Sequence, residues 1–288
     1  MAGSFYESES KEAITCIEDL LNVSRNIRRP GPGVNPADFS PPYWRGHGDR
    51  TWKLTPTIGR NQTFAGKACN LLNEEDRLLN RFRRYASKFI GHVPDEWEAL
   101  FLARHHGLPV RLLDWSSNPL VALYNACREL ENKAGAVFAI IRKPNESAFI
   151  NIMEKDPPPP LDVPGLRMVY PIHASPRIVA QAGFFTIQAN PAIPLEKHER
   201  DSPKAEEFDF VQLMKWRIPS ENKQSMLEEL SYLGVNRQTL YPDLDGLAMG
   251  LWHTVVLRSG KTSGACTNCD GSGICPECGG SGCGPPFS

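Results

Sequence analysis

The sequence contains no hydrophobic run that approaches the roughly 18–20 apolar residues of a membrane-spanning helix. It has no excess of either charge, because 32 Lys and Arg residues stand against 33 Asp and Glu residues in a chain of 288. The N-terminal stretch "MAGSFYESESKEAITCIEDLLN" is acidic and holds no apolar signal-peptide core. These absences favour a cytoplasmic protein with no membrane partner. The net charge of −1 gives no general attraction to nucleic acid.

Cysteines are scarce over most of the chain and crowded at its end. Only three of the eight lie outside the C-terminal tail, and each falls singly in a stretch with a helical pattern (Cys16, Cys69 and Cys127). Single scattered cysteines are typical of reduced core thiols rather than of a disulfide framework. The other five follow the linker-like stretch "RSGKTSGA", residues 258–265.

The tail "CTNCDGSGICPECGGSGC" contains two CxxC pairs, each followed by a Gly-x-Gly element. Two such turns can supply the tetrahedral four-sulfur shell that Zn²⁺ prefers, and the metal would supply the folding energy that so short a segment lacks. Redox-active or unliganded cysteines are the alternatives. The repeat resembles half of the zinc module of DnaJ-type chaperones, and half a module does not imply chaperone activity. We expect structural zinc on Cys266, Cys269, Cys275 and Cys278, with Cys283 as a spare thiol.

The rest of the chain predicts an α+β fold, because strand-like stretches are too many for a helical bundle and the helices fall among them irregularly. We expect an N-terminal helix and loop over 1–37, a main domain over 38–257, a linker over 258–265 and a zinc tail over 266–288. Apolar periodicity and capping residues predict helices over 8–26, 73–90, 94–105, 118–130, 221–233 and 245–253. Aromatic and β-branched stretches predict strands at "YWRGH", "TWKLTPTI", "LPVRLLDWSS", "GAVFAIIRK", "MVYPIHA" and "GFFTIQAN".

Charged residues interrupt the apolar stretch "WEALFLARHHGLPVRLLDWSSNPLVALYNACRE", residues 97–129. Arg111 and Asp114 lie in a strand-like segment, where burying a charge costs several kcal/mol unless it is paired or holds a ligand. Two serines then lead into a helix N-terminus, which favours an anion. His105 and His106 fall at a helix end, where hydrogen bonding to the helix and catalysis are both open.

"YWRGH", "HHGLPVRLLDWSSNPLVALYNA" and "LYPDLDGLA" resemble blocks of the FRG domain, which is named for a Phe-Arg-Gly signature. The resemblance covers about residues 38–250, and Tyr-Trp precedes Arg45-Gly46 where the signature has phenylalanine. FRG domains occur among bacterial toxins and phage-defence systems. The resemblance therefore implies a toxin of a toxin–antitoxin–chaperone system, with antitoxin and chaperone proteins as partners.

The order of these elements also resembles that of ADP-ribosyltransferases. Many of those enzymes hold NAD with an arginine on the first core strand; a serine-containing strand then enters a helix, and a buried strand follows. A later strand carries a catalytic glutamate, with Glu or Gln two residues before it. Arg45, "DWSSNPLVALYNACRE", "AGAVFAIIRK" and "RIVAQAGFFTI" match these elements in order, with Gln181 at the earlier position. Gly183 stands where the glutamate is expected.

This resemblance implies an NAD-dependent enzyme with a split β-sheet core and a helical insertion. Arg45 would hold the NAD pyrophosphate, or it is a surface charge at the end of a strand. Without a carboxylate at Gly183 to stabilise an oxocarbenium-like transition state, the acid would come from Asp114, Asp243 or Asp245, or the domain binds without catalysis. The expected catalytic residues are Arg45, His106, Asp114 and Gln181, and the expected NAD-binding residues are Arg45, Arg111, Ser116, Ser117 and Arg177.

The helix predicted over 73–90 carries a row of bases at helical spacing: Arg77, Arg81, Arg84 and Lys88. Such a row is either a solvated face or a contact for a nucleic-acid backbone. We expect a nucleic acid, with RNA favoured, as the acceptor of ADP-ribose. A non-catalytic nucleotide- or nucleic-acid-binding module and a metal-free nuclease using His105 or His106 with Asp114 are the alternative functions.

Overall fold

The computed structural model describes residues 7–10, 12–27, 41–60, 63–64, 67–68, 70–142, 149–171, 175–197 and 210–258. The chain divides into two compact units, Met1–Asn236 and Arg237–Ser288, so that the division falls before the boundary expected near residue 257. In the first unit the helices are α1 (Ile17–Ile27), α2 (Thr57–Arg60), α3 (Leu71–Ile90), α4 (Glu96–His105), α5 (Pro119–Cys127), α6 (Pro176–Ala180) and α7 (Lys223–Tyr232). Its strands are β1 (Glu7–Glu9), β2 (Tyr43–His47), β3 (Thr63–Phe64), β4 (Lys67–Ala68), β5 (Leu112–Ser116), β6 (Gly135–Arg142), β7 (Phe149–Ile150), β8 (Leu166–Val169), β9 (Gly183–Gln188) and β10 (Phe210–Ile218). The second unit contains α8 (Arg237–Leu240) and α9 (Leu244–Arg258).

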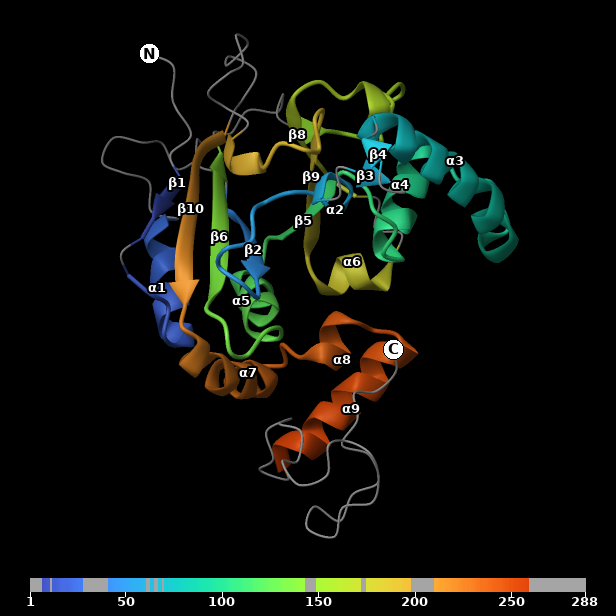
Figure 1. Ribbon diagram of the computed structural model, residues 1–288. Coiled ribbons are helices and arrows are strands. Elements are labelled where there is room, and N and C mark those ends of the chain that lie inside the picture. Colours follow the sequence, from blue (N-terminus) through green and yellow to red (C-terminus); the bar gives the residue numbers. More distant parts are fainter. Residues whose placement is uncertain are drawn as a thin grey trace, which may run out of the picture. The chain divides into compact units, whose positions relative to one another are not determined.

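The main sheet of the first unit consists of two halves that meet at its centre. Its strand order is β1-β10-β6-β2-β5-β9-β8-β7. β2 pairs with β6 along its whole length, whereas it meets β5 only at the pair Trp44–Ser116. β5 in turn pairs with β9 over five residues. The strands β2 and β5 therefore diverge, and the sheet is split between them (Figure 1).

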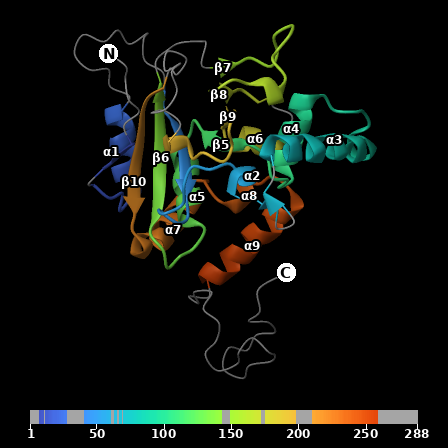
Figure 2. The same cartoon turned by 45° about the horizontal axis from the view of Figure 1, so that its top comes forward.

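Different helices cover the two halves. α5 packs against β2, and α1 and α7 pack against α5. On the other half, apolar residues of α3, α4 and α6 form one buried cluster with β5, β8 and β9. Figures 1 and 2 show these two groups of helices on opposite sides of the split. The separation between β2 and β5 thus lies between two groups of helices, while one buried apolar cluster with residues from β2, β5, β6, β8 and β10 runs across it.

The glycine after Arg45 is required by the close approach of α5. A Cβ atom on Gly46 would lie 1.8 Å from the backbone oxygen of Ala122 and 2.6 Å from the backbone nitrogen of Ala126. No side chain fits in that space. The Arg-Gly pair in "YWRGH" therefore combines a polar side chain on β2 with a position where the backbone of α5 lies directly against the strand.

Most predicted elements are confirmed, with shifted ends. α1 begins at Ile17 rather than near residue 8, because the Asp19 carboxylate accepts hydrogen bonds from the backbone N–H groups of Thr15 and Cys16 and starts the helix there. α3 is capped by Asn70 rather than Asn73. The predicted Asn118 cap of α5, followed by Pro119, is confirmed.

One predicted strand is wrong: "TWKLTPTI" runs through a loop into the short helix α2. The nine-residue strand β10, which pairs with β6 over most of its length, has no counterpart among the predicted strands. At the start of α9 the carboxylate of Asp243 accepts a hydrogen bond from the Gly246 N–H at 2.6 Å.

Candidate functional site

Arg45 lies at the split in the sheet. Its Nη1 donates a hydrogen bond to the backbone oxygen of Asp114 at 2.5 Å, where β2 and β5 diverge. Its Nε donates to Nε2 of His47 at 2.9 Å, which requires that ring nitrogen to be unprotonated. The side chain is 11% exposed. Arg45 therefore connects the two half-sheets and is not a surface charge.

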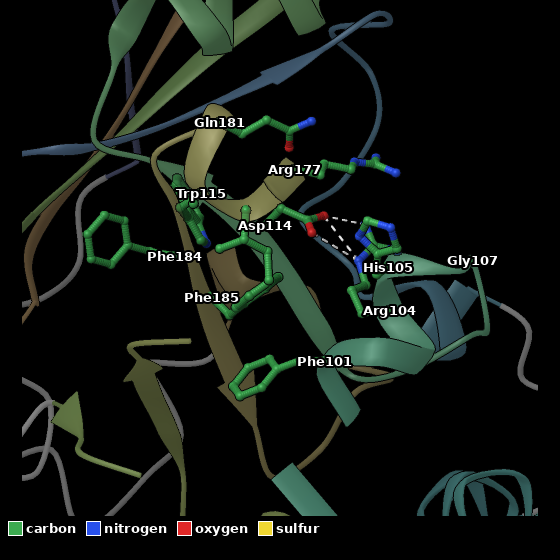
Figure 3. A pocket seen from close by; sticks show the side chains of 12 residues that line it. Phe101, Arg104, His105, Gly107, Asp114, Trp115, Arg177, Gln181, Phe184 and Phe185 are labelled. Atoms are coloured by element: carbon green, nitrogen blue, oxygen red, sulfur yellow. Dashed lines mark hydrogen bonds and ion pairs between the residues drawn. The ribbon is translucent and has the colours of Figure 1, made fainter. Parts of the chain in front are cut away.

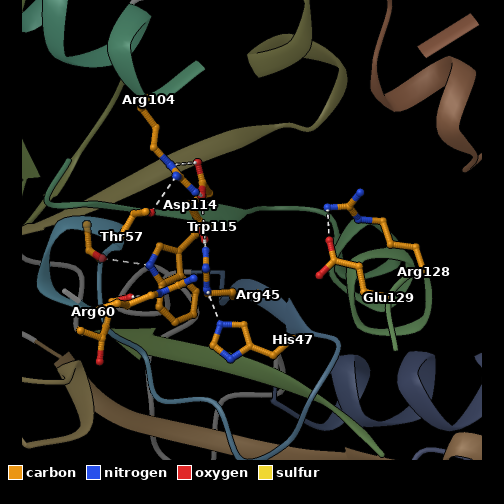
Figure 4. A network of polar contacts seen from close by, with 11 residues as sticks. Arg45, His47, Thr57, Arg60, Arg104, Asp114, Trp115, Arg128 and Glu129 are labelled. Carbon is orange, nitrogen blue, oxygen red and sulfur yellow. Dashed lines mark hydrogen bonds and ion pairs between the residues drawn. The ribbon is translucent and has the colours of Figure 1, made fainter. Parts of the chain in front are cut away.

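The carboxylate of Asp114 is held between two arginines (Figure 4). It accepts hydrogen bonds from Nε and Nη2 of Arg104, at the end of α4, and lies 3.5 Å from Nη1 of Arg45. Arg104 also donates from Nη1 to the Thr57 hydroxyl at 3.1 Å. Asp114 thus joins α4 to the split of the sheet. We call Arg45, Asp114, Arg104, Arg60 and Arg177 the arginine cluster.

Positive charge exceeds negative charge in this cluster. Burial lowers the pKa of Arg45 to about 10; the charges of Arg104 and Arg60 add to this decrease, and Asp114 opposes it. Desolvation raises the pKa of the Asp114 carboxyl, but the charge and hydrogen bond of Arg104, with the charges of Arg45 and Arg177, hold it below its ordinary value. At neutral pH the cluster therefore holds four cations and one carboxylate, and the charge of Glu129, outside the cluster, also acts on Arg60.

A cavity of about 160 Å³ opens beside this cluster (Figure 3). Its polar lining includes Arg104, His105, Asp114, Arg177 and Gln181, and its apolar lining comes chiefly from aromatic residues of α4, β5 and β9 (Phe101, Trp115, Phe184 and Phe185). Figure 3 shows the polar side chains gathered toward one end and the phenyl rings toward the other. Such a cavity fits a ligand with an anionic part and a flat apolar part.

His105, rather than His106, reaches the cavity. The His105 ring lines it, and its Nδ1 lies 3.1 Å from the hydroxyl of Ser175, the residue that caps α6. His106 is exposed at the end of α4, does not line the cavity and contacts His105 edge to face. The contact between His105 and Ser175 joins α4, which carries Arg104, to α6, which carries Arg177.

Ser116 and Ser117 hold the turn between α6 and β9 in place. The Ser116 hydroxyl donates to the Gln181 backbone oxygen at 2.7 Å and accepts from the Asn118 N–H, and the Ser117 N–H donates to the Ala182 oxygen at 3.0 Å. These contacts place Gln181 at the cavity wall. Their role in NAD binding stays a prediction.

Gly183 lies beside Gln181 in the cavity wall, at the start of β9. A Cβ atom there would lie 3.3 Å from the Ile178 oxygen, tighter than an ordinary contact. The wall is therefore closed to a side chain at this position unless α6 shifts by a few tenths of an ångström.

Arg111 is not brought to the cavity. Its guanidinium is 1% exposed and pairs with the Glu75 carboxylate from α3, which also accepts the Arg111 backbone N–H at 2.6 Å. Burial raises the pKa of the Glu75 carboxyl, and Arg111 opposes that rise. The sealed pair, Arg111 and Glu75, fastens α3 to β5.

Arg104 and Arg60 were missed by the sequence interpretation. Arg104 lies on a helix whose neighbours Leu100, Phe101 and Ala103 are buried, so the criterion that selected Arg111 and Asp114, a charge in an apolar segment, applies equally to Arg104. Arg60 carries no such signal, because it follows the predicted strand "TWKLTPTI" and does not lie within an apolar segment. The predicted zinc ligands Cys266, Cys269, Cys275 and Cys278 lie outside the described residues.

The fold and site define a mixed α+β protein with a split sheet and an arginine-rich cavity at the split. Residues 40–135 match the family model of the FRG domain. This match includes Arg45, Arg60, Arg104 and Asp114, and it ends before α6 and β9 complete the cavity. No curated protein and no solved structure matches the chain. In the part of the chain that the structure describes, no helix has the length and apolar character needed to cross a membrane.

Proposed function

We propose that the cavity is the NAD site of an ADP-ribosyltransferase-like enzyme. The observation that carries the proposal is the arginine cluster itself: four cations lie around one carboxylate, and two of them, Arg104 and Arg177, line a cavity with an aromatic end. A net positive site of this kind favours a phosphate-bearing ligand, and arginine binds phosphate through paired hydrogen bonds.

The arrangement of strands supports the same proposal. The four sequence blocks that resemble ADP-ribosyltransferases lie far apart in the chain, yet they become the neighbouring strands β9, β5, β2 and β6. The arginine strand and the serine strand lie on the two sides of the split. A ligand held by several of these blocks at once would have to bind here.

Arg104 and Arg177 line the cavity and are the direct contacts for the NAD pyrophosphate in this proposal. Arg45 acts through Asp114, whose backbone and carboxylate it contacts. A cavity of about 160 Å³ accommodates one part of a dinucleotide, so the remainder of NAD would extend outside it. The acceptor nucleic acid, with RNA favoured, and the toxin role in defence remain predictions from the resemblance.

A non-catalytic nucleotide-binding module is the second candidate. Two observations favour it: Gly183 stands where a catalytic glutamate is expected, and the Asp114 carboxylate is already bound by Arg104. Binding of NAD without transfer of ADP-ribose or loss of nicotinamide would identify this case.

The test measures binding and transfer separately. Calorimetry with NAD, ADP-ribose and pyrophosphate should detect binding that falls at least tenfold in Arg177→Gln and is unchanged in the control Arg25→Gln, whose residue is exposed on α1. Incubation with labelled NAD and total RNA, DNA or protein should label an acceptor. No binding of any of the three ligands, together with no transfer, overturns the proposal.

A further inference from the structure

The outer face of α3 carries a row of cations with an aromatic ring among them. Glu75 and the apolar residues Leu71, Leu79 and Ala86 face inward and are buried. The exposed residues recur at the complementary spacing and line a shallow surface hollow, with the partly buried Asp76 at its edge: Arg77, Asn80, Arg81, Arg84, Tyr85 and Lys88. We call these six exposed residues the α3 face.

The charge on the α3 face is uneven along the helix. The acidic residues Glu74 and Asp76 lie in its first two turns, where Glu74 pairs with Arg77 at 2.9 Å and Asp76 accepts from Asn80. From Arg77 to Ile90 the helix contains no acidic residue. The four cations of the α3 face therefore outnumber Asp76, the carboxylate that lines the same hollow, and leave it net positive.

Tyr85 lies in the middle of this positive row. Its ring is 57% exposed, and the Arg81 guanidinium lies 5.9 Å from the ring centroid, within the range of a cation–π contact. An exposed tyrosine beside arginines offers a face on which a nucleobase can stack. A solvated charged face has no need of such a ring.

We propose that the α3 face binds the backbone of a single-stranded nucleic acid. From Arg77 to Lys88 the helix extends about 16 Å at 1.5 Å per residue, enough to meet two or three consecutive phosphates. Three of the four cations are arginines, which bind phosphate oxygens in pairs, and Tyr85 supplies the stacking contact. Figures 1 and 2 both show α3 at the outer edge of the first unit, where a long strand has access.

This inference deepens the proposed function, because it names the surface at which a nucleic-acid acceptor would bind. It does not depend on transfer of ADP-ribose, since binding is measured without NAD. Absence of NAD binding would refute the proposed function and would not affect the proposal for the α3 face. Absence of oligonucleotide binding would refute the proposal for the α3 face and would not affect the NAD site.

The experiment uses the full chain and fluorescence anisotropy with labelled U12, dT12 and a 12-base-pair duplex. Both single strands should bind more tightly than the duplex, with an affinity that falls with salt, at a logarithmic slope of about −1.4 to −2.1 for two or three phosphate contacts. Arg81→Glu/Arg84→Glu should weaken binding at least tenfold and make the slope shallower. Tyr85→Ala should weaken binding about fivefold or more, and Tyr85→Phe should restore it.

The matched control Arg25→Glu/Lys155→Glu makes the same change in net charge at exposed positions elsewhere in the first unit. Equal loss of affinity in the control and the α3 variant would overturn the proposal, because the attraction would then be diffuse. Preferential binding to vesicles of phosphatidylserine and phosphatidylcholine, with oligonucleotide binding unchanged in the α3 variant, would also overturn it. Thermal unfolding of each variant by circular dichroism verifies that the fold is intact.

Discussion

The arginine cluster and the sealed pair Arg111–Glu75 place the same kinds of side chain in opposite surroundings. In the sealed pair both side chains are 1% exposed and one carboxylate meets one guanidinium. In the arginine cluster Asp114 is 42% exposed and several guanidinium groups share it. The interior pair joins α3 to the start of β5, although Nη1 and Nη2 of Arg111 are buried with no hydrogen-bond partner among the described residues. The Asp114 carboxylate and its arginines lie beside a cavity instead, where an anion can reach them.

The largest expected effect comes from breaking the sealed pair. Glu75→Ala leaves the Arg111 guanidinium buried without a counter-charge and removes the acceptor of the Arg111 backbone N–H. We expect a loss of about 3–5 kcal/mol in the free energy of unfolding, measured with urea. The double variant Glu75→Leu/Arg111→Met should recover most of that loss, because it leaves no isolated charge.

The control for this prediction is the neighbouring residue. Glu74→Ala removes an exposed pair with Arg77 and should cost under about 0.5 kcal/mol. If Glu75→Ala lowers the free energy of unfolding no more than Glu74→Ala does, the interior pair does not fasten α3 to β5. The two regions would then not differ in what their ion pairs contribute to stability.

Removing the carboxylate of the arginine cluster should cost less stability and increase anion binding. In Asp114→Asn the guanidinium groups lose their shared partner, but water reaches the site, so we expect a loss of about 1–2 kcal/mol. The change removes one negative charge a few ångströms from the cavity, worth about 1 kcal/mol or roughly fivefold in pyrophosphate affinity. Calorimetry with pyrophosphate checks the gain. Unchanged or weaker binding would show that Asp114 contacts the ligand rather than competing with it.

The sequence singles out one charged residue of the sealed pair, Arg111, and one of the arginine cluster, Asp114, but does not show that their surroundings differ. Arg111 and Asp114 carry the same signal, a charge in an apolar strand, and lie three residues apart. Their surroundings differ because Glu75 of α3 covers one end of β5, while β2 diverges from β5 near the other end. Both contacts join residues far apart in the sequence. The cavity wall from α6 likewise depends on chain about 70 residues away.

Local patterns predicted β2, β5, β6, β9, α4 and α5, where capping residues or apolar runs decide the structure. For β10 the signal was present and missed: Met214, Trp216 and Ile218 alternate with Lys215 and Arg217, but the alternation starts after an irregularity in the pairing with β6. Period-two alternation over so few residues is easily overlooked beside stronger strands.

The arginine cluster should also respond to pH, through the neutral His47 ring that accepts a hydrogen bond from Arg45. Burial and the Arg45 charge hold the pKa of His47 well below its ordinary value, so the folded protein keeps the ring neutral as the acceptor for Arg45. Below about pH 6.5 the unfolded chain takes up a proton that the folded chain does not. Stability should therefore fall with decreasing pH from about 6.5, at up to about 1.4 kcal/mol per pH unit.

His47→Gln keeps an acceptor and removes the titration, so it should flatten this part of the stability curve between pH 5 and 6.5. His92 is the control. It is exposed, and the hydrogen bond that its ring donates to Glu98 raises its pKa. This shift has the opposite sign, so His92→Gln should leave the loss of stability in acid in place. Urea unfolding at a series of pH values distinguishes the two variants. Identical slopes in the wild type and His47→Gln would contradict the assignment.

The smallest expected effect concerns backbone strain at the rim of the cavity. Ala182, between Gln181 and Gly183, has φ of +45°, a left-handed conformation that costs an alanine about 1 kcal/mol more than a glycine. Ala182→Gly should raise the free energy of unfolding by about 0.5–1 kcal/mol, while Ala180→Gly, within α6, should lower it by a similar amount.

Hydrogen bonds from Ser116 and Ser117 hold this turn. If the strain serves to place Gln181 for a ligand, the more stable Ala182→Gly variant will bind NAD less tightly. A gain in stability with unchanged affinity would instead mean that the fold only tolerates the strain, and that the cavity wall does not depend on it.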